Sequence, residues 1–161
     1  MRVFLLRHAE AHPGVWDEGR ELTAKGRRQI AQVARGAGLV AVQTVRAIEH
    51  SPLVRSVQSA ERLQRGTKSR LPLKLLAGIK PESDDRLTAR QLAKSRQDRL
   101  IVGHNPHLAA LAGRLLGMTS GSRISFRKAG LMALEREAGP TTKQPYGRWR
   151  LLWYVVPDLT K

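Results

Sequence analysis

The sequence contains no cysteine among its 161 residues. Disulfide bonds, thiolate nucleophiles and thiolate metal sites are therefore excluded, and a reducing compartment suits such a chain. Aromatic residues make up only 4% of the chain, which leaves few platforms on which nucleic-acid bases could stack. No apolar run reaches the length of a membrane span, and the first residues do not form a signal peptide. We expect a cytoplasmic protein with no membrane contact.

Acidic residues are also scarce, because 13 Asp and Glu stand against 29 Lys and Arg and leave a formal net charge of +16. A charge of this size attracts anionic partners and raises the rate at which they are encountered. The basic residues are spread along the chain, however, and a cysteine-free chain lacks zinc-finger spacing, which argues against a dedicated role in binding nucleic acid. Phosphorylated proteins and small polyanionic metabolites remain as partners that a basic surface would steer.

Strand-like and helix-like segments alternate along the chain, which is the pattern of a sheet covered by helices. The predicted strands are 2–7, 42–50, 72–79, 98–104, 129–137 and 149–156, and the predicted helices are 22–37, with Thr23 as N-cap, 53–65, 83–94 and 105–117. The polar connection 138–147 joins the last two strands as a hairpin loop. The sequence thus predicts one α/β domain over 1–161, a three-layer fold with a mainly parallel central sheet, helices on both faces and a late antiparallel edge.

Arginine and histidine recur where predicted strands end. Arg7 and His8 follow the first strand, Arg55 lies just after the second, and His104 ends the fourth. Because the carboxyl ends of parallel strands meet at one edge of a sheet, where α/β proteins bind ligands, these four side chains should converge. Each alone could be an ordinary loop histidine or surface arginine. Their joint placement favours a ligand-binding site at this edge of the sheet.

Two histidines and two arginines suit phosphoryl transfer. A neutral imidazole can attack phosphorus and carry the phosphoryl group covalently. Arginine offers a fork of donors to the phosphate oxygens and offsets the charge of the transition state, so that no metal ion is required. A metallohydrolase site, with His8 and His12 flanking Glu10, is disfavoured because Pro13 and the preceding strand argue against the helix that such a pair needs.

Four segments carry further sequence signals, in the order of the chain. They are "LLRHAEA" (5–11), "RELTAKGRRQ" (20–29), "SPLVRSVQSAERL" (51–63) and "VGHNPHL" (102–108). Together they resemble the histidine phosphatase superfamily, also called the phosphoglycerate-mutase-like family. The first segment is similar to the Arg-His-Gly/Ala motif of that family, and the second to its R-x-L-T-x-x-G segment. The third is similar to its S-P-x-x-R-A-x-Q-T-A segment, and the fourth to the segment that carries its second histidine. Ser56 and Ser59 replace the usual alanine and threonine. The short chain is most similar to the small SixA-type phosphohistidine phosphatases.

The resemblance implies a role for several of these residues. His8 would be the nucleophile that becomes phosphohistidine, and His104 would be the second catalytic histidine. Arg7 and Arg55 would hold the phosphate. Arg20 would reach the phosphate or the rest of the substrate. The resemblance implies no metal ion and no other cofactor.

A general acid is harder to assign. Relatives take it from the region after the third strand, where Glu82 is the candidate, whereas Asp84 and Asp85 fit the acidic first turn of a helix. An alcohol leaving group needs a proton, while an imidazole, with a pKa of about 6.5, leaves readily once it is protonated. The absence of a decisive acid motif therefore favours phosphohistidine over a phosphate ester as substrate.

The sequence predicts a metal-independent phosphatase that acts through a phosphohistidine intermediate and removes phosphate from phosphohistidine on a protein, such as a phosphorelay domain. Two alternatives stay open. One is a phosphomonoesterase of the same family that acts on a small phosphorylated metabolite, and the other is a non-catalytic relative that binds phosphorylated ligands or polyanions. The segments that would face the leaving group, 12–19 and 78–86, match no pattern that decides between them.

Overall fold

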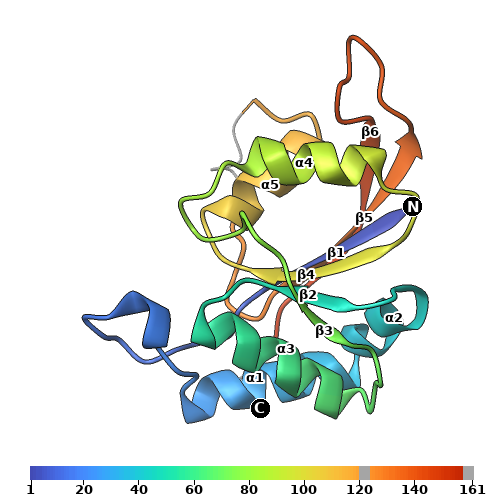
Figure 1. Ribbon diagram of the computed structural model, residues 1–161. Coiled ribbons are helices and arrows are strands. Elements are labelled where there is room, and N and C mark those ends of the chain that lie inside the picture. The colour runs from blue at the N-terminus through green and yellow to red at the C-terminus, as the bar shows by residue number, and fades with distance from the viewer. Residues whose placement is uncertain (120–123, 158–161) are drawn as a thin grey trace.

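The computed structural model describes residues 1–119 and 124–157, which form a six-stranded sheet between two layers of helices (Figure 1). The strands are β1 (Arg2–Arg7), β2 (Ile48–His50), β3 (Leu73–Leu75), β4 (Arg99–Gly103), β5 (Leu131–Ala138) and β6 (Arg148–Val155). The helices are α1 (Ala24–Arg35), α2 (Ala37–Thr44), α3 (Val54–Gly66), α4 (Asp85–Lys94) and α5 (His107–Leu115), with a short 3-10 helix, η1 (Asp17–Gly19).

The strand order is β3-β2-β4-β1-β5-β6. The first four strands of this order are parallel, whereas β5 is antiparallel to β1 and β6 is antiparallel to β5. Strand β1 therefore lies inside the sheet, paired with β4 up to the partners Arg7 and Gly103. The predicted α/β fold, with a mainly parallel sheet and a late antiparallel edge, is confirmed.

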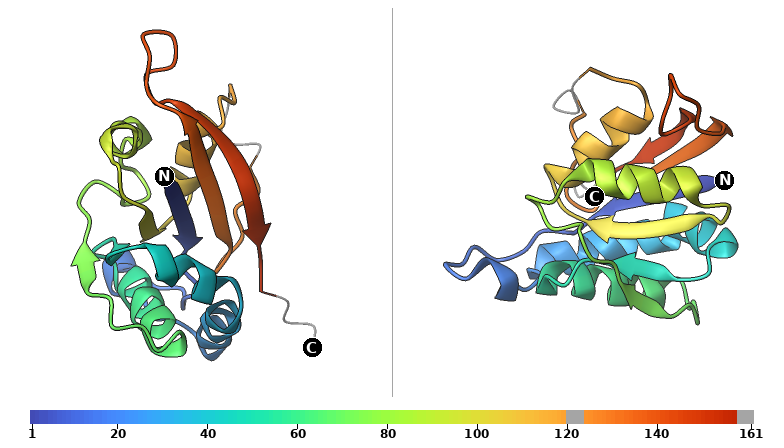
Figure 2. Two further views of the ribbon diagram at one scale, coloured as in Figure 1. Left: turned by 90° about the vertical axis from the view of Figure 1, so that its right-hand side faces the viewer. Right: turned by 45° about the horizontal axis from the view of Figure 1, so that its top comes forward.

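The apolar run of β1 is explained by helices on both faces of the sheet. Phe4 and Leu6 pack in a core cluster with residues of α1 and α3, while Val3 and Leu5 pack in a second cluster with residues of α4 and α5. Successive side chains of a strand point to opposite faces, so a strand covered on both sides must be apolar throughout. Figure 2 shows the two helical layers on either side of the twisted sheet.

Helix α1 begins where its sequence signals predict. The side chain of Thr23 accepts a hydrogen bond from the backbone N–H of Gly26 at 2.9 Å, which is the N-cap arrangement, and the helix ends at Gly36. Gly26 also permits a close approach, because a Cβ there would lie 2.0 Å from the carbonyl oxygen of Glu10. The first turn of α1 therefore packs directly against the segment that follows β1.

One predicted strand is wrong over most of its length. The sequence predicts an extended segment over 42–50, but the chain forms α2 up to Thr44, and only Ile48–His50 pairs as β2. A short apolar run cannot be told from a buried strand by its periodicity alone. The tertiary contact that decides is at Gly38, where a Cβ would lie 2.8 Å from Leu63 of α3, so that α2 packs closely on its neighbour. The strand predicted at 72–79 is likewise shorter, spanning Leu73–Leu75.

The other predicted helices are confirmed within a few residues at each end, as α3, α4 and α5. The side chain of Asp84 accepts a hydrogen bond from the backbone N–H of Arg86 and caps α4, while Asp85 pairs with Arg114 of α5. Both acids therefore have the helical role that their spacing indicates. None of the described helices is long and apolar enough to cross a bilayer.

Candidate active site

The carboxyl ends of β1, β2 and β4 bring the predicted arginines and histidines together. Backbone N–H of His8 donates to the carbonyl of Gly103 at 2.9 Å, which fixes the turn after β1 against the end of β4. The imidazole rings of His8 and His104 lie with their centroids 5.0 Å apart. Arg55 stands in the first turn of α3, directly after the end of β2. These residues therefore share one edge of the sheet.

His8 is held in a defined orientation in a nearly dry environment. Its residue surface is 6% exposed, and its Nδ1 lies 2.6 Å from the carbonyl oxygen of Ala9. A nitrogen so close to a carbonyl oxygen must carry the proton, so the Nε2 atom keeps its lone pair. The pKa of His8 is lowered from 6.5 to about 3, mainly by desolvation and also by the charges of Arg55 and Arg7. The hydrogen bond to Ala9 raises the pKa but does not offset these effects. His8 is therefore neutral at physiological pH.

His104 is the more deeply buried of the two histidines, at 1% exposure. Its Nε2 is in hydrogen-bond contact with the hydroxyl of Ser51, while its Nδ1 has no partner among the described residues. Desolvation, followed by the proximity of His8 and Arg55, lowers its pKa to about 2. Ser51 stands in one of the segments that carry the family resemblance, but nothing in the sequence singles it out as the residue that orients His104.

The two arginines present unpartnered donors at the same edge. Arg7 donates from Nη1 to the carbonyl of Phe126 at 2.7 Å, and Arg55, 3% exposed, donates from both terminal nitrogens to Asp17. The Nε atoms of Arg7 and Arg55 are buried and have no partner among the described residues. An unpaired buried donor costs free energy, and its occurrence calls for an explanation. Two guanidinium groups beside a neutral histidine give this edge of the sheet a positive charge, which suits an anion.

Asp17 is a residue of this cluster that sequence reasoning missed. Its Oδ2 accepts from Arg55 Nη2 at 2.9 Å, its backbone carbonyl accepts from Arg55 Nη1 at 2.6 Å, and its Oδ1 accepts from Arg20 Nη1 at 3.0 Å. Desolvation raises the pKa of this carboxyl, but the hydrogen bonds from Arg55 and Arg20 outweigh that effect and leave the pKa below its usual value. Asp17 is thus an ionised bridge between the two arginines.

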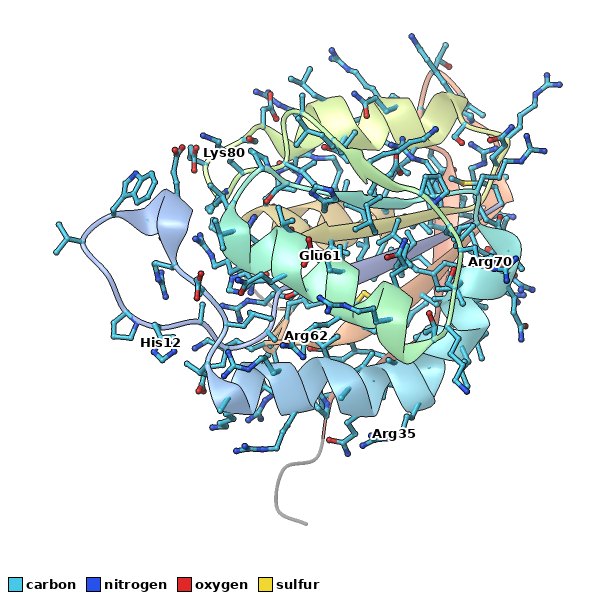
Figure 3. All side chains as sticks on the ribbon, turned by 60° about the horizontal axis from the view of Figure 1, so that its bottom comes forward. His12, Arg35, Glu61, Arg62, Arg70 and Lys80 are labelled. Atoms are coloured by element: carbon cyan, nitrogen blue, oxygen red, sulfur yellow. The ribbon has the colours of Figure 1, made fainter. Side chains whose placement is uncertain are left out.

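Among the described residues, the hydrogen bond to Asp17 is what joins Arg20 to the cluster. Arg20 also donates a hydrogen bond from Nε to the backbone carbonyl of His12 at 2.7 Å, which closes the base of the loop that carries η1. That loop projects from the molecule beyond the end of α1 (Figure 3). No periodicity or motif marks this loop in the sequence, so the only available signal for Asp17 was a carboxylate in a strongly basic chain, three residues before Arg20.

Glu82 is not joined by hydrogen bonds or ion pairs to the predicted arginines and histidines, among the described residues. It is exposed in the turn between β3 and α4, and no hydrogen bond or ion pair within the described residues joins its side chain to His8 or His104. Its neighbour Lys80 instead pairs with Glu18 of η1 at 2.7 Å. The role of Glu82 as general acid stays a prediction.

The lowered pKa values of His8 and His104 make the protein sensitive to acid. Between pH 6.5 and the folded pKa values, the unfolded chain binds protons that the folded one does not, so stability is complete above pH 6.5 and falls as the pH decreases. Each histidine should reduce the free energy of unfolding by up to about 1.4 kcal/mol per pH unit in this range. Urea unfolding at pH 7 and pH 5 measures the effect. A His8→Asn/His104→Gln variant should lose distinctly less stability over this interval, and an equal loss would contradict the assignment.

Comparisons with known proteins give a family model and a set of similar structures. The model of the histidine phosphatase superfamily (branch 1) matches residues 3–81. The protein histidine phosphatase SixA complexed with tungstate has a TM-score of 0.76 at 21% identity, over 98% of this chain and 97% of that one. An Agrobacterium tumefaciens protein assigned as the phosphohistidine phosphatase SixA has a TM-score of 0.77 at 24% identity, over 97% of both chains.

A mycobacterial glucosyl-3-phosphoglycerate phosphatase is also similar, with a TM-score of 0.68 at 18% identity over 93% of this chain and 96% of that one. No curated protein sequence matches the chain. At these identities the solved structures show a shared fold, while the family model covers the segments that supply Arg7, His8 and Arg55. The family model and the fold agree: residues 3–81 match the histidine phosphatase superfamily, and the whole chain has the fold of the SixA structures.

Proposed function

We propose that the protein is a phosphatase that acts through a phosphohistidine intermediate on His8 and removes phosphate from phosphohistidine on a protein. Members of the superfamily are phosphatases and mutases with a histidine nucleophile. The observation that carries the proposal is the state of His8, a neutral imidazole whose Nδ1 is tied to Ala9 and whose Nε2 is left with its lone pair. A histidine whose role was only to bind an anion would gain from being protonated, and the neighbouring arginines oppose that.

The reaction takes two displacements at phosphorus. In the first, Nε2 of His8 forms a bond to the phosphorus while the bond to the leaving group breaks, and the leaving group takes up a proton. In the second, water attacks the phosphohistidine and releases inorganic phosphate and neutral His8. The guanidinium groups of Arg7 and Arg55 bind the equatorial oxygens, whose charge is spread out in the transition state. His104 faces the same oxygens from the adjacent strand end. The arginines supply the positive charge, so no step requires a metal ion.

The chemistry of the leaving group decides which substrate class the site favours. An alkoxide must be protonated by an acid, and among the described residues no hydrogen bond or ion pair holds Glu82 against His8 or His104. An imidazole leaving group takes its proton readily, because its pKa lies near neutrality. The similar structures named SixA are phosphohistidine phosphatases by name, which agrees with this choice.

A direct comparison of substrates tests the proposal. The purified protein is incubated with a phosphohistidine-bearing phosphorelay domain and, separately, with p-nitrophenyl phosphate, and the release of inorganic phosphate is followed against the spontaneous rate. We expect a higher kcat/KM on the phosphohistidine domain. A preference for p-nitrophenyl phosphate would keep the mechanism but change the substrate to a phosphomonoester. Release from neither would contradict the proposed activity.

A further inference from the structure

A cavity opens beside Arg7, and neither His8 nor His104 is among its lining residues. Its volume is about 630 Å³, and its charged lining residues are Arg7, Glu10, Lys25, Arg127 and Lys128. Four cations therefore face one carboxylate. That carboxylate is already engaged, because Glu10 accepts from the hydroxyl of Thr23 at 3.0 Å and pairs with Lys25 at 3.4 Å. The cavity is left with a clear excess of positive charge.

The turn that carries Arg127 and Lys128 is fixed against the residues of the candidate active site. The carbonyl of Phe126 accepts from Arg7 Nη1 at 2.7 Å and from Asn105 Nδ2 at 3.0 Å. The backbone N–H of Ala129 donates to the carbonyl of His8 at 3.2 Å, and Ala129 is held at a φ of 55°, which a residue with a Cβ adopts at a cost. These contacts place the two basic residues next to the nucleophile on a rigid support.

The side chains of Arg127 and Lys128 are exposed and form no ion pair among the described residues, although many other basic side chains of the molecule do. The charge of Lys128 is also among those that lower the pKa of His8. Cations that have no ion-pair partner among the described residues and line one cavity suit an anionic ligand, since carboxylates and phosphates accept charge-assisted hydrogen bonds from both arginine and lysine. Arg7 lines this cavity and also belongs to the candidate active site, so one ligand can reach both the cavity and His8.

We infer that this cavity binds a second anionic group of the substrate, a carboxylate or phosphate attached close to the phosphoryl group that His8 receives. The inference rests on the proposed function and narrows its substrate class. The same chemistry has two sources. One is an acidic side chain beside the phosphorylated residue of a protein, and the other is the second anionic group of a small phosphorylated metabolite.

Binding of inorganic anions tests the cavity without requiring turnover. Calorimetry compares tripolyphosphate, which can span both sites, with inorganic phosphate, which fills only one. We expect the wild-type protein to bind tripolyphosphate at least tenfold more tightly than phosphate. An Arg127→Gln/Lys128→Gln variant should lose about tenfold in tripolyphosphate affinity and change less than twofold in phosphate affinity.

The matched control is an Arg35→Gln/Arg70→Gln variant. It removes the same charge from exposed positions at the end of the molecule opposite the loop of His12 (Figure 3). We expect both affinities of this variant to stay within twofold of wild type. The inference would be overturned if both double variants lost the same affinity for tripolyphosphate. It would also be overturned if the Arg127→Gln/Lys128→Gln variant lost as much affinity for phosphate as for tripolyphosphate. In either case only general attraction by net charge would be at work.

Two substrate pairs distinguish the sources. The first pair consists of two phosphohistidine peptides, one with aspartates beside the modified residue and one with asparagines in their place. The second pair is phosphoserine, which has a carboxylate, and phosphoethanolamine, which lacks it. A preference for the acidic member that the Arg127→Gln/Lys128→Gln variant loses supports the inference and identifies the source by the pair in which it occurs. Turnover without such a preference in either pair overturns it. If nothing is turned over while the tripolyphosphate difference persists, the anion cavity stands and the proposed phosphatase activity fails.

Discussion

Replacing His8 with alanine should abolish phosphate release, with a loss of at least about 10⁴-fold in kcat. The change removes the atom that forms the bond to phosphorus, and removing a covalent nucleophile costs several orders of magnitude in enzymes where it has been measured. The measurement is steady-state phosphate release, combined with trapping of the phosphoenzyme on an alkaline denaturing gel, because a phosphorus–nitrogen bond survives alkali and not acid.

A matched control keeps this result specific. His12 is an exposed histidine on the projecting loop (Figure 3), and His12→Ala should retain activity and phosphoenzyme within twofold of wild type. Thermal unfolding of both variants checks that each is folded. Undiminished phosphate release from folded His8→Ala would remove His8 as the nucleophile, whatever happens at His12.

Replacing Arg55 with lysine should lower kcat/KM by about 10² to 10³-fold. Lysine keeps the charge but loses the planar fork of donors, and arginine is the side chain that binds phosphate and carboxylate through two nitrogens at once. An arginine that stabilises a phosphoryl-transfer transition state contributes about 10³ to 10⁵ in rate. At Arg55 the terminal nitrogens also hold Asp17, so the planar fork has a second task that lysine cannot perform in the same way. Wild-type activity in Arg55→Lys would show that this guanidinium does not bind the transferred group.

The contact between Arg55 and Asp17 predicts a smaller effect at Asp17. Asp17→Asn keeps the shape and the backbone contact but removes the charge that orients Arg55, so that kcat/KM should fall about tenfold, mainly through kcat. Glu18→Gln is the matched control on the same 3-10 helix, since Glu18 pairs with Lys80 and not with either arginine of the cluster. Faster turnover in Asp17→Asn would instead mean that Asp17 competes with the substrate for Arg55.

Local patterns were sufficient wherever neighbours in the chain determine the structure. The four apolar residues before Arg7 predict a strand covered on both faces, and β1 is such a strand. Thr23 predicts a helix start because its side chain caps a backbone group only three residues away. The apolar run after Gly36 is compatible with either a helix or a buried strand, so its pattern does not distinguish the two. The close packing of Gly38 against Leu63 favours the helix.

The sequence alone predicts that a histidine and an arginine stand at the end of a buried first strand and that Arg55 and His104 follow strands that should lie beside it. It also carries the resemblance to histidine phosphatases. The groups that orient these side chains become visible only in the folded chain. Asp17 meets Arg55 across 38 positions of the chain, and Ser51 meets His104 across 53. Such pairings depend on how the loops cross the edge of the sheet, where no periodic pattern constrains them. The cavity beside Arg7 has the same origin, since its basic residues come from α1, the end of β1 and the turn before β5.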